Sequence, residues 1–330
     1  YLKMKKTTFL TAAVAALALG TTVASAGTLD DVKANGELRC IVSTGLPGFA
    51  YTDANGVYQG FDADFCRATA AAVLGDASKV KYIPATGKTR FTLLNSGEGD
   101  VIWRNTTWTF VRDVDVKTTF VGVNYYDGQG FMVPKALGVK SAKDLDGATV
   151  CIQTGTTTEL NLADYFRTNK ISYEPVPIED SEEARKNYLA GRCDVYTTDA
   201  SGLAASRAVF DNPKDHIILP EIISKEPLGP VVRHGDDQWS DIIRWTYNAV
   251  VAAEELGVSR SWLSKRLAVL KYDPEIRAVA RDGYLRDYAT LKKIAELSPE
   301  KQRMALELIR TDEFNAADFF KRKRRPKHEI

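Results

Sequence analysis

The sequence contains very few of the residues on which catalysis and metal binding usually depend. Only three of its 330 residues are histidines, and none of them falls within a candidate site motif. The four cysteines form no CxxC pair, which leaves a zinc ribbon or a thioredoxin-like site unsupported. No Ser-His-Asp arrangement or metal-ligand cluster can be traced either. We therefore expect no enzyme, no metal site and no cofactor.

Long hydrophobic runs are also missing after the first 26 residues. The apolar run at residues 9–19 is too short to span a bilayer, but it follows Lys5 and Lys6 and precedes small residues that end at Ala26. This pattern predicts a secretory signal peptide over residues 1–26, with no membrane span left after cleavage; an uncleaved anchor is the alternative. The residues before Met4, the expected natural start, are interpreted as read-through.

Charge is distributed unevenly, although the net charge is only +1. Residues 27–255 carry a net charge of −9, whereas residues 256–330 carry 18 Lys and Arg against 11 Asp and Glu, a net charge of +7. An acidic body joined to a basic tail indicates two modules with different partners.

Strands alternate with helices through most of the chain, which predicts an α/β fold. One unit of alternating elements covers the first part, a second begins near residue 130, and later strands lead back toward the first unit. We predict five segments after the signal peptide: lobe 1 at 27–130 and 222–250, lobe 2 at 131–221, an all-α segment at 251–320 and a basic tail at 321–330.

The four cysteines fall in pairs within these lobes. Export would place them in an oxidising compartment, where an even count favours disulfides. Of the three possible pairings we predict Cys40–Cys66 and Cys151–Cys193, because each then joins neighbouring elements of one lobe. Four buried free thiols are the alternative.

Residues 100–112 (DVIWRNTTWTFVR) combine an apolar strand with a polar exit. Asn105 and Thr107 follow the strand, and Arg112 comes eight residues after Arg104. A guanidinium forks onto two carboxylate oxygens and hydroxyls bind the remaining lone pairs, so this stretch suits a small carboxylate. The alternative is a strand followed by a solvated loop with scattered charge.

Two similar exits occur in the second unit. A strand at 148–153 runs into Gly155 and the threonines at 156–158, where backbone N–H groups and the positive end of a helix attract an anion; helix capping is the alternative. Asp199 lies just beyond a strand at 193–197. Its carboxylate either pairs with an ammonium group or caps the next helix.

These motifs resemble those of a known family. The segments GLPGFAYTDANGVYQGFDADFC, RNTTWTFVRD, YYDGQGFMV, QTGTTTELNLADYF, AGRCDVYTTDASGL and HIILPEIISKEPLGP look like the periplasmic general L-amino-acid-binding proteins of ABC importers, over residues 27–250. The resemblance implies a two-lobed periplasmic-binding-protein type II fold that closes on an L-amino acid. It also implies a periplasmic location and delivery to a membrane permease of the importer. An enzyme on the same scaffold, such as a periplasmic dehydratase, is a weaker alternative.

The resemblance also implies roles for single residues. Arg112 matches the arginine that holds the α-carboxylate, and Thr157 matches a second carboxylate contact. Asp199 matches the acceptor for the α-ammonium, while Asn105 and Thr107 match hydrogen-bonding positions of lobe 1. The aromatic residue that covers the ligand matches Phe49, with Tyr51 as the alternative, and Arg104 and Trp108 are extra groups that could shape the side-chain pocket.

The C-terminal part departs from this family. Residues 252–320 resemble the DNA-binding segment of ParB-type partition proteins, with Gly257 in the turn of a helix-turn-helix. The recognition helix and its DNA-contacting side chains are expected at Ser259, Arg260, Ser261, Lys265 and Arg266. Phosphate contacts from the basic tail would add to them. Two amphipathic helices with a solvated charged face are the alternative.

An exported chain does not meet DNA, so the two resemblances conflict. The simplest interpretation is a chimera with a seam near residues 248–256. Capture of an amino acid is therefore the expected function, and DNA binding through the C-terminal segment is the alternative.

Overall fold

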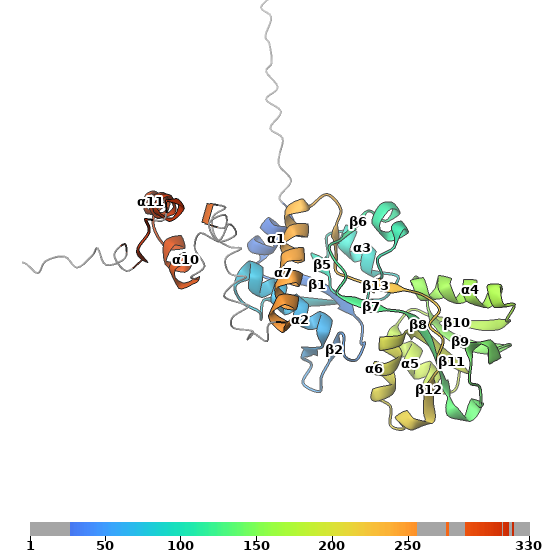
Figure 1. The fold of residues 1–330 in the computed structure, drawn as a ribbon. Coiled ribbons are helices and arrows are strands. Elements are labelled where there is room, and N and C mark those ends of the chain that lie inside the picture. The colour runs from blue at the N-terminus through green and yellow to red at the C-terminus, as the bar shows by residue number, and fades with distance from the viewer. Residues whose placement is uncertain (1–26, 256–274, 277–287, 312, 317–318, 320–330) are drawn as a thin grey trace, which may run out of the picture.

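The structure is a computed structural model in which two five-stranded sheets form two lobes (Figure 1). It describes residues 27–255, 275–276, 288–311, 313–316 and 319. The signal peptide predicted at residues 1–26 lies outside the described residues. Among the residues described, no helix combines the length and apolarity that crossing a membrane requires.

Lobe 1 is built on the sheet β4-β1-β5-β14-β6. Its strands are β1 (Leu38–Ser43), β4 (Val80–Ala85), β5 (Val101–Ile102), β6 (Thr118–Phe120) and β14 (Val231–Arg233). Strands β1, β4 and β5 are parallel, whereas β14 returns from lobe 2 and pairs antiparallel with β5 and β6. The lobe also contains a small hairpin and five helical segments: β2 (Tyr51–Thr52), β3 (Tyr58–Gln59), α1 (Thr28–Asn35), α2 (Phe61–Leu74), α3 (Arg90–Asn95), a π-helix at Val111–Asp115 and α7 (Asp237–Glu255).

Large aromatic side chains hold lobe 1 together. Phe65 of α2 stacks on Trp103 at a centroid distance of 4.4 Å, and both side chains are buried. Trp239 of α7 is fully buried and donates its indole N–H to the Asp100 carbonyl at 2.8 Å. The returning chain therefore supplies part of this lobe's core, because α7 packs on α1 and α2.

Lobe 2 is built on the sheet β10-β9-β11-β8-β12. Its strands are β8 (Gln129–Pro134), β9 (Ala148–Gln153), β10 (Tyr173–Ile178), β11 (Val195–Asp199) and β12 (His216–Ile218). Its helices are α4 (Thr157–Asn169), α5 (Ser181–Leu189), α6 (Ala200–Ala208) and three short 3₁₀ turns at Lys135–Leu137, Ala142–Asp144 and Pro213–Asp215. Strands β9, β10 and β11 are parallel, so β9 and β11 end at the same edge of the sheet.

Two short strands join the lobes. β7 (Tyr125–Asp127) carries the chain into lobe 2, and β13 (Glu226–Leu228) carries it back. They pair antiparallel with each other, as Figure 1 shows between the two sheets. This pair is the natural axis for movement of one lobe relative to the other.

Both predicted disulfides are confirmed. Cys40 of β1 is bonded to Cys66 of α2 in lobe 1, and Cys151 of β9 is bonded to Cys193 in lobe 2. Each bridge joins elements of a single lobe, so neither one restricts movement between the lobes.

The described C-terminal residues include the helices α10 (Tyr288–Ala295) and α11 (Pro299–Arg310). They contact each other and share an apolar cluster that contains Leu291, Ile294 and Leu306. The residues expected to form the recognition helix, 259–266, and the basic tail, 321–330, lie outside the described residues.

Candidate ligand-binding site

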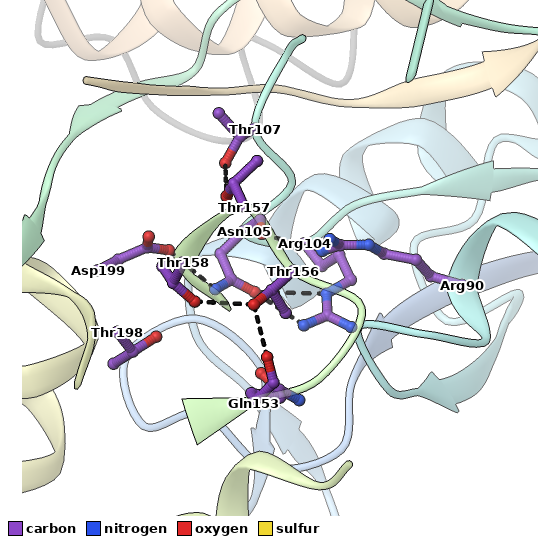
Figure 2. Close-up of a pocket in the computed structure, with 10 residues that line it drawn as sticks. All are labelled: Arg90, Arg104, Asn105, Thr107, Gln153, Thr156, Thr157, Thr158, Thr198 and Asp199. Atoms are coloured by element: carbon purple, nitrogen blue, oxygen red, sulfur yellow. Dashed lines mark hydrogen bonds between the residues drawn. The ribbon is translucent and has the colours of Figure 1, made fainter. Parts of the chain in front are cut away.

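A polar pocket lies between the lobes, where strands β5, β9 and β11 end (Figure 2). Lobe 1 contributes residues from α3 and from the segment after β5, and lobe 2 contributes the ends of β9 and β11 with the start of α4. The lining residues are Arg90, Arg104, Asn105, Thr107, Gln153, Thr156, Thr157, Thr158, Thr198 and Asp199.

Asp199 provides a buried negative charge in this pocket. It is the last residue of β11, its exposed fraction is 4%, and its carboxylate accepts a hydrogen bond from the Asn105 side chain at 3.1 Å. Burial raises the pKa of Asp199 to about 7, and the carboxylates of Asp127 and Glu226 act in the same direction. The group therefore lacks a cationic partner that would fully stabilise its ionised form, and a ligand ammonium would supply one.

Two arginines of lobe 1 face the same pocket. Arg104 donates to the Ala85 carbonyl at 2.8 Å and to the Asn105 side-chain oxygen at 3.1 Å. Arg90 donates to the Asn105 carbonyl and to Thr106, both at 3.2 Å, while its buried Nε has no hydrogen-bond partner.

Both guanidinium groups are almost fully buried. Burial lowers the pKa of Arg104 to about 10, and burial followed by repulsion from the neighbouring arginines lowers the pKa of Arg90 well below its usual value. Two cations side by side without a full set of acceptors favour an anionic group from the ligand.

Arg112 is the residue predicted to hold the ligand carboxylate. It does not line the pocket; it lies in the π-helix behind Thr107, donates to the Thr107 carbonyl at 2.8 Å, and stacks over Phe91 at 5.4 Å. Burial lowers its pKa to about 10, against the opposing effects of Glu226 and Asp199. Its role in binding a carboxylate stays a prediction.

The aromatic residues assigned from the sequence also lie outside the pocket lining. Phe49 is buried and makes edge contacts with Phe61 and Tyr125, at centroid distances of 6.2 and 5.9 Å. Tyr51 belongs to the hairpin strand β2, and Trp108 stacks on Phe120 at 5.6 Å.

Thr157 opens α4, and the turn before it explains its placement. Gly155 has φ of +69°, a left-handed conformation that favours glycine, and a Cβ atom there would lie 3.0 Å from the Lys88 backbone of lobe 1. Thr156 caps the helix by accepting a hydrogen bond from the Glu159 backbone N–H. Thr156, Thr157 and Thr158 at the start of α4 all line the pocket, and the positive end of a helix favours an anion there.

Several contacts cross between the lobes and show that they lie against each other. Asn105 reaches Asp199, Thr107 lies 3.3 Å from Thr157, and Lys88 forms an ion pair of 2.8 Å with Glu179. The pocket is therefore enclosed by both lobes.

The sequence analysis assigned the lining residues Asn105, Thr107, Thr157 and Asp199 to the ligand, and it also pointed to Arg104 and to the threonines at 156 and 158. It missed Arg90, Gln153 and Thr198. Arg90 follows the exit of β4 through the polar stretch TGKTR, a signal of the same kind as the exits that were recognised.

A two-lobed α/β fold that encloses a charged pocket defines a binding protein for a small polar molecule. The chain belongs to the bacterial extracellular solute-binding proteins, family 3, whose family model matches residues 38–265. This match continues beyond the seam expected near residues 248–256. It also covers four of the residues assigned to DNA contact: Ser259, Arg260, Ser261 and Lys265.

Similar proteins support this membership. The chain is 62% identical over 275 residues to the glutamate/glutamine/aspartate/asparagine-binding protein BztA of Rhodobacter capsulatus, covering 83% of this chain and 80% of that protein. It is 59% identical over 258 residues to the general L-amino acid-binding periplasmic protein AapJ of Rhizobium johnstonii, covering 78% and 76%.

A solved structure has the same fold. An ABC transporter periplasmic binding protein from Brucella ovis, with glutathione bound, is 47% identical and superposes with a TM-score of 0.69, covering 90% of each chain. These relatives are binding proteins and not enzymes, in agreement with the expectation for this chain.

Proposed function

We propose that this protein captures an amino acid between its two lobes in the periplasm and delivers it to the permease of an ABC importer. The observation that carries the proposal is the placement of buried charges of opposite sign on the two lobes. Arg90 and Arg104 face the pocket from lobe 1, and Asp199 faces it from lobe 2. A zwitterion that leaves water needs a partner for each of its charges, and this pocket provides both.

The family resemblance implies individual roles for the ligand contacts. Asp199 accepts from the α-ammonium group, with Asn105 and Thr107 as neighbouring hydrogen-bonding groups. Arg112 holds the α-carboxylate, as the family resemblance implies, together with the backbone N–H of Thr157 at the start of α4. Phe49 packs against the apolar part of the ligand.

Arg90 and Arg104 extend the proposal to the class of side chain. With the α-carboxylate assigned to Arg112, Arg90 and Arg104 are left for a second acceptor group on the ligand, and the unpartnered Nε of Arg90 is a free donor. A carboxylate or amide at the end of the ligand's side chain satisfies these donors. The relatives named for glutamate, glutamine, aspartate and asparagine and for glutathione point to the same chemistry. We therefore propose a preference for amino acids with acidic or amide side chains over cationic ones.

Titration calorimetry of the chain beginning at residue 27 tests the proposal with glutamate, glutamine, leucine and lysine. Glutamate and glutamine should bind more tightly than leucine, and lysine should bind most weakly, because its ammonium group would meet Arg90 and Arg104. Tighter binding of lysine than of glutamate would contradict the proposed side-chain preference. The absence of binding by all four amino acids would contradict the proposed function.

The variant Arg104→Gln separates the side-chain contact from the rest of the site. It should weaken glutamate about tenfold or more relative to leucine, the effect of losing a hydrogen bond to a charged group. Arg67→Gln is the matched control, because Arg67 bonds to Tyr58, Tyr82 and Asp64 within lobe 1 and does not line the pocket. An equal loss of affinity for glutamate and leucine in Arg104→Gln would show that Arg104 does not contact the side chain of the ligand.

The alternative function, DNA binding through residues 251–330, gains no support from the family model or from the relatives described above. The resemblance to ParB-type proteins stays an observation on the sequence, and retention on duplex DNA that falls steeply with salt would be its test.

A further inference from the structure

Glu226 is a buried carboxylate with no assigned role in holding the ligand. It is the first residue of β13, the strand on which the chain returns from lobe 2 to lobe 1, and its exposed fraction is only 2%. It does not line the ligand pocket. Because a buried carboxylate is costly unless its oxygens are satisfied, its partners indicate what it does.

Four side chains donate hydrogen bonds to Glu226. Oε2 accepts from the hydroxyl groups of Thr107 at 2.5 Å and Thr157 at 2.8 Å. Oε1 accepts from the Asn161 amide at 2.7 Å and the Ser224 hydroxyl at 2.5 Å. Thr107 belongs to lobe 1, Thr157 and Asn161 belong to α4 of lobe 2, and Ser224 lies beside β13. One carboxylate therefore connects both lobes and the segment between them.

The number of available protons shows that the approach of Thr107 to Thr157 depends on this carboxylate. Each threonine hydroxyl has a single proton to donate. If both protons go to Oε2, the 3.3 Å approach of Thr107 to Thr157 contains no hydrogen bond of its own. The carboxylate is what holds these two hydroxyl groups together across the cleft.

We propose that Glu226 is a closure latch, a positioning residue that stabilises the closed arrangement of the lobes without touching the ligand. Rotation about β7 and β13 would carry Thr157 and Asn161 away with lobe 2 and leave Thr107 with lobe 1. The full set of four hydrogen bonds therefore exists only when the lobes lie together. The inference rests on the proposed function in so far as closure serves to capture an amino acid.

The latch has a defined consequence for affinity. Apparent affinity scales with the fraction of molecules in the binding-competent arrangement, and a residue that favours closure raises the affinity for every ligand by one common factor. A residue that contacts the ligand would instead change the order of preference among ligands. This difference separates the two roles.

Two substitutions of Glu226 and one control form the experiment. Glu226→Ala removes all four hydrogen bonds. Glu226→Gln keeps Oε1 as the acceptor for Asn161 and Ser224 and replaces Oε2 with an NH₂ group. After their hydroxyl groups rotate, Thr107 and Thr157 can each accept a hydrogen bond from this NH₂ group. Glu221→Gln is the control, because Glu221 accepts from Ser141 and from the backbone N–H of Ala142, both within lobe 2.

The readouts are the distance between fluorescent labels on the two lobes and the calorimetric affinities for glutamate, glutamine and leucine. Without ligand, Glu226→Ala should increase the mean distance, and all three affinities should fall by the same factor, about tenfold or more. Glu226→Gln should lie between Glu226→Ala and the original chain, and Glu221→Gln should match the original chain. Saturating glutamate should restore the short distance in every variant.

Three results would overturn the latch: an unchanged distance in ligand-free Glu226→Ala, a change in the order of ligand preference, or tighter binding after the substitution. If Glu226→Ala fails to fold, Glu226→Gln carries the same comparison with the smaller expected change. The distance measurement without ligand needs no amino acid, so it tests the latch even if the proposed ligands do not bind.

Discussion

Burial of charged side chains dominates the chemistry of the site at the scale of single residues. Asp199 and the arginines opposite it are removed from water, and each is less stable in its charged form than it would be in solvent. A bound zwitterion would stabilise the charged forms of Asp199 and of the arginines at the same time. Because these buried groups lack full partners without a ligand, the site selects for a charged ligand.

The raised pKa of Asp199 predicts a pH dependence of binding. Its pKa is about 7 in the folded chain, above the usual carboxylate value, so part of the population is protonated near neutral pH. The ionised form is the one that accepts an ammonium group, and we expect amino-acid affinity to rise with pH through about 7 and proton release on binding. Calorimetry in buffers of different ionisation enthalpy measures that release.

Burial also raises the pKa of Asp62 to about 7, so the proton release of Asp62 must be distinguished from that of Asp199. Asp199→Asn should abolish the proton release and weaken binding, whereas Asp62→Asn should leave the proton release in place. Equal proton release from the original chain and from Asp199→Asn would show that another group titrates with the ligand.

These shifts also affect stability. Because folding raises the pKa of both carboxyl groups, the folded chain holds more protons than the unfolded chain between pH of about 4 and 7. Their contribution to the free energy of unfolding is therefore present at acidic pH and is lost as the pH rises through 7. Ligand binding and ligand-free stability thus respond to pH in opposite directions.

At the scale of single elements, the hydrophobic pattern indicated some strands and missed others. Strands β9 and β11 stand at or close to their expected positions, 148–153 and 193–197. Strands β6, β7 and β10 were not recognised. β10 (YEPVPI) contains two prolines and an exposed glutamate and is an edge strand, where proline costs no ladder hydrogen bond.

The two disulfides make a prediction about individual elements. Cys40–Cys66 closes 26 residues of lobe 1 and Cys151–Cys193 closes 42 residues of lobe 2. Replacing either pair by serine should lower the stability of its own lobe by about 2–5 kcal/mol, with the larger loop giving the larger effect. Denaturant unfolding of the two double variants measures the loss.

Neither disulfide crosses between the lobes, so amino-acid affinity well below the unfolding temperature should be unchanged in both double variants. A large loss of affinity with an intact fold would mean that a bridge also positions the pocket.

At the scale of the whole molecule, the ligand site and the C-terminal helices are structurally separate. Every residue that lines the pocket or takes part in the latch lies between 90 and 226. The helices α10 and α11 pack in a cluster of their own, whose members are Ile276, Leu291, Ile294, Ala305, Leu306 and Ile309.

A chain that ends at residue 265, the limit of the family match, should therefore bind amino acids with unchanged affinity. A chain that ends at residue 236 is the matched control and should not bind, because it lacks α7 and with it the buried side chains of Trp239 and Ile243. Loss of binding in the chain that ends at residue 265 would show that residues beyond 265 complete lobe 1. Calorimetry on both truncations distinguishes these outcomes.

The sequence by itself determined what depends on local order along the chain. The alternation of strands and helices predicted the two lobes, and the placement of the cysteines within each lobe predicted the two disulfides. The position of polar residues directly after strands pointed to Asn105, Thr157 and Asp199. These signals are visible because parallel strands place their exits at a common edge, so that neighbours in the pattern become neighbours in space.

Only the tertiary structure decided which distant groups meet at that edge. Arg90 lines the pocket from the first position of α3, whereas Arg112 lies in the π-helix at Val111–Asp115 and donates to the Thr107 carbonyl. Glu226 reaches Thr107 across 119 positions of sequence. Such contacts depend on how the two lobes pack on either side of strands β7 and β13, and no short-range pattern in the chain encodes that packing.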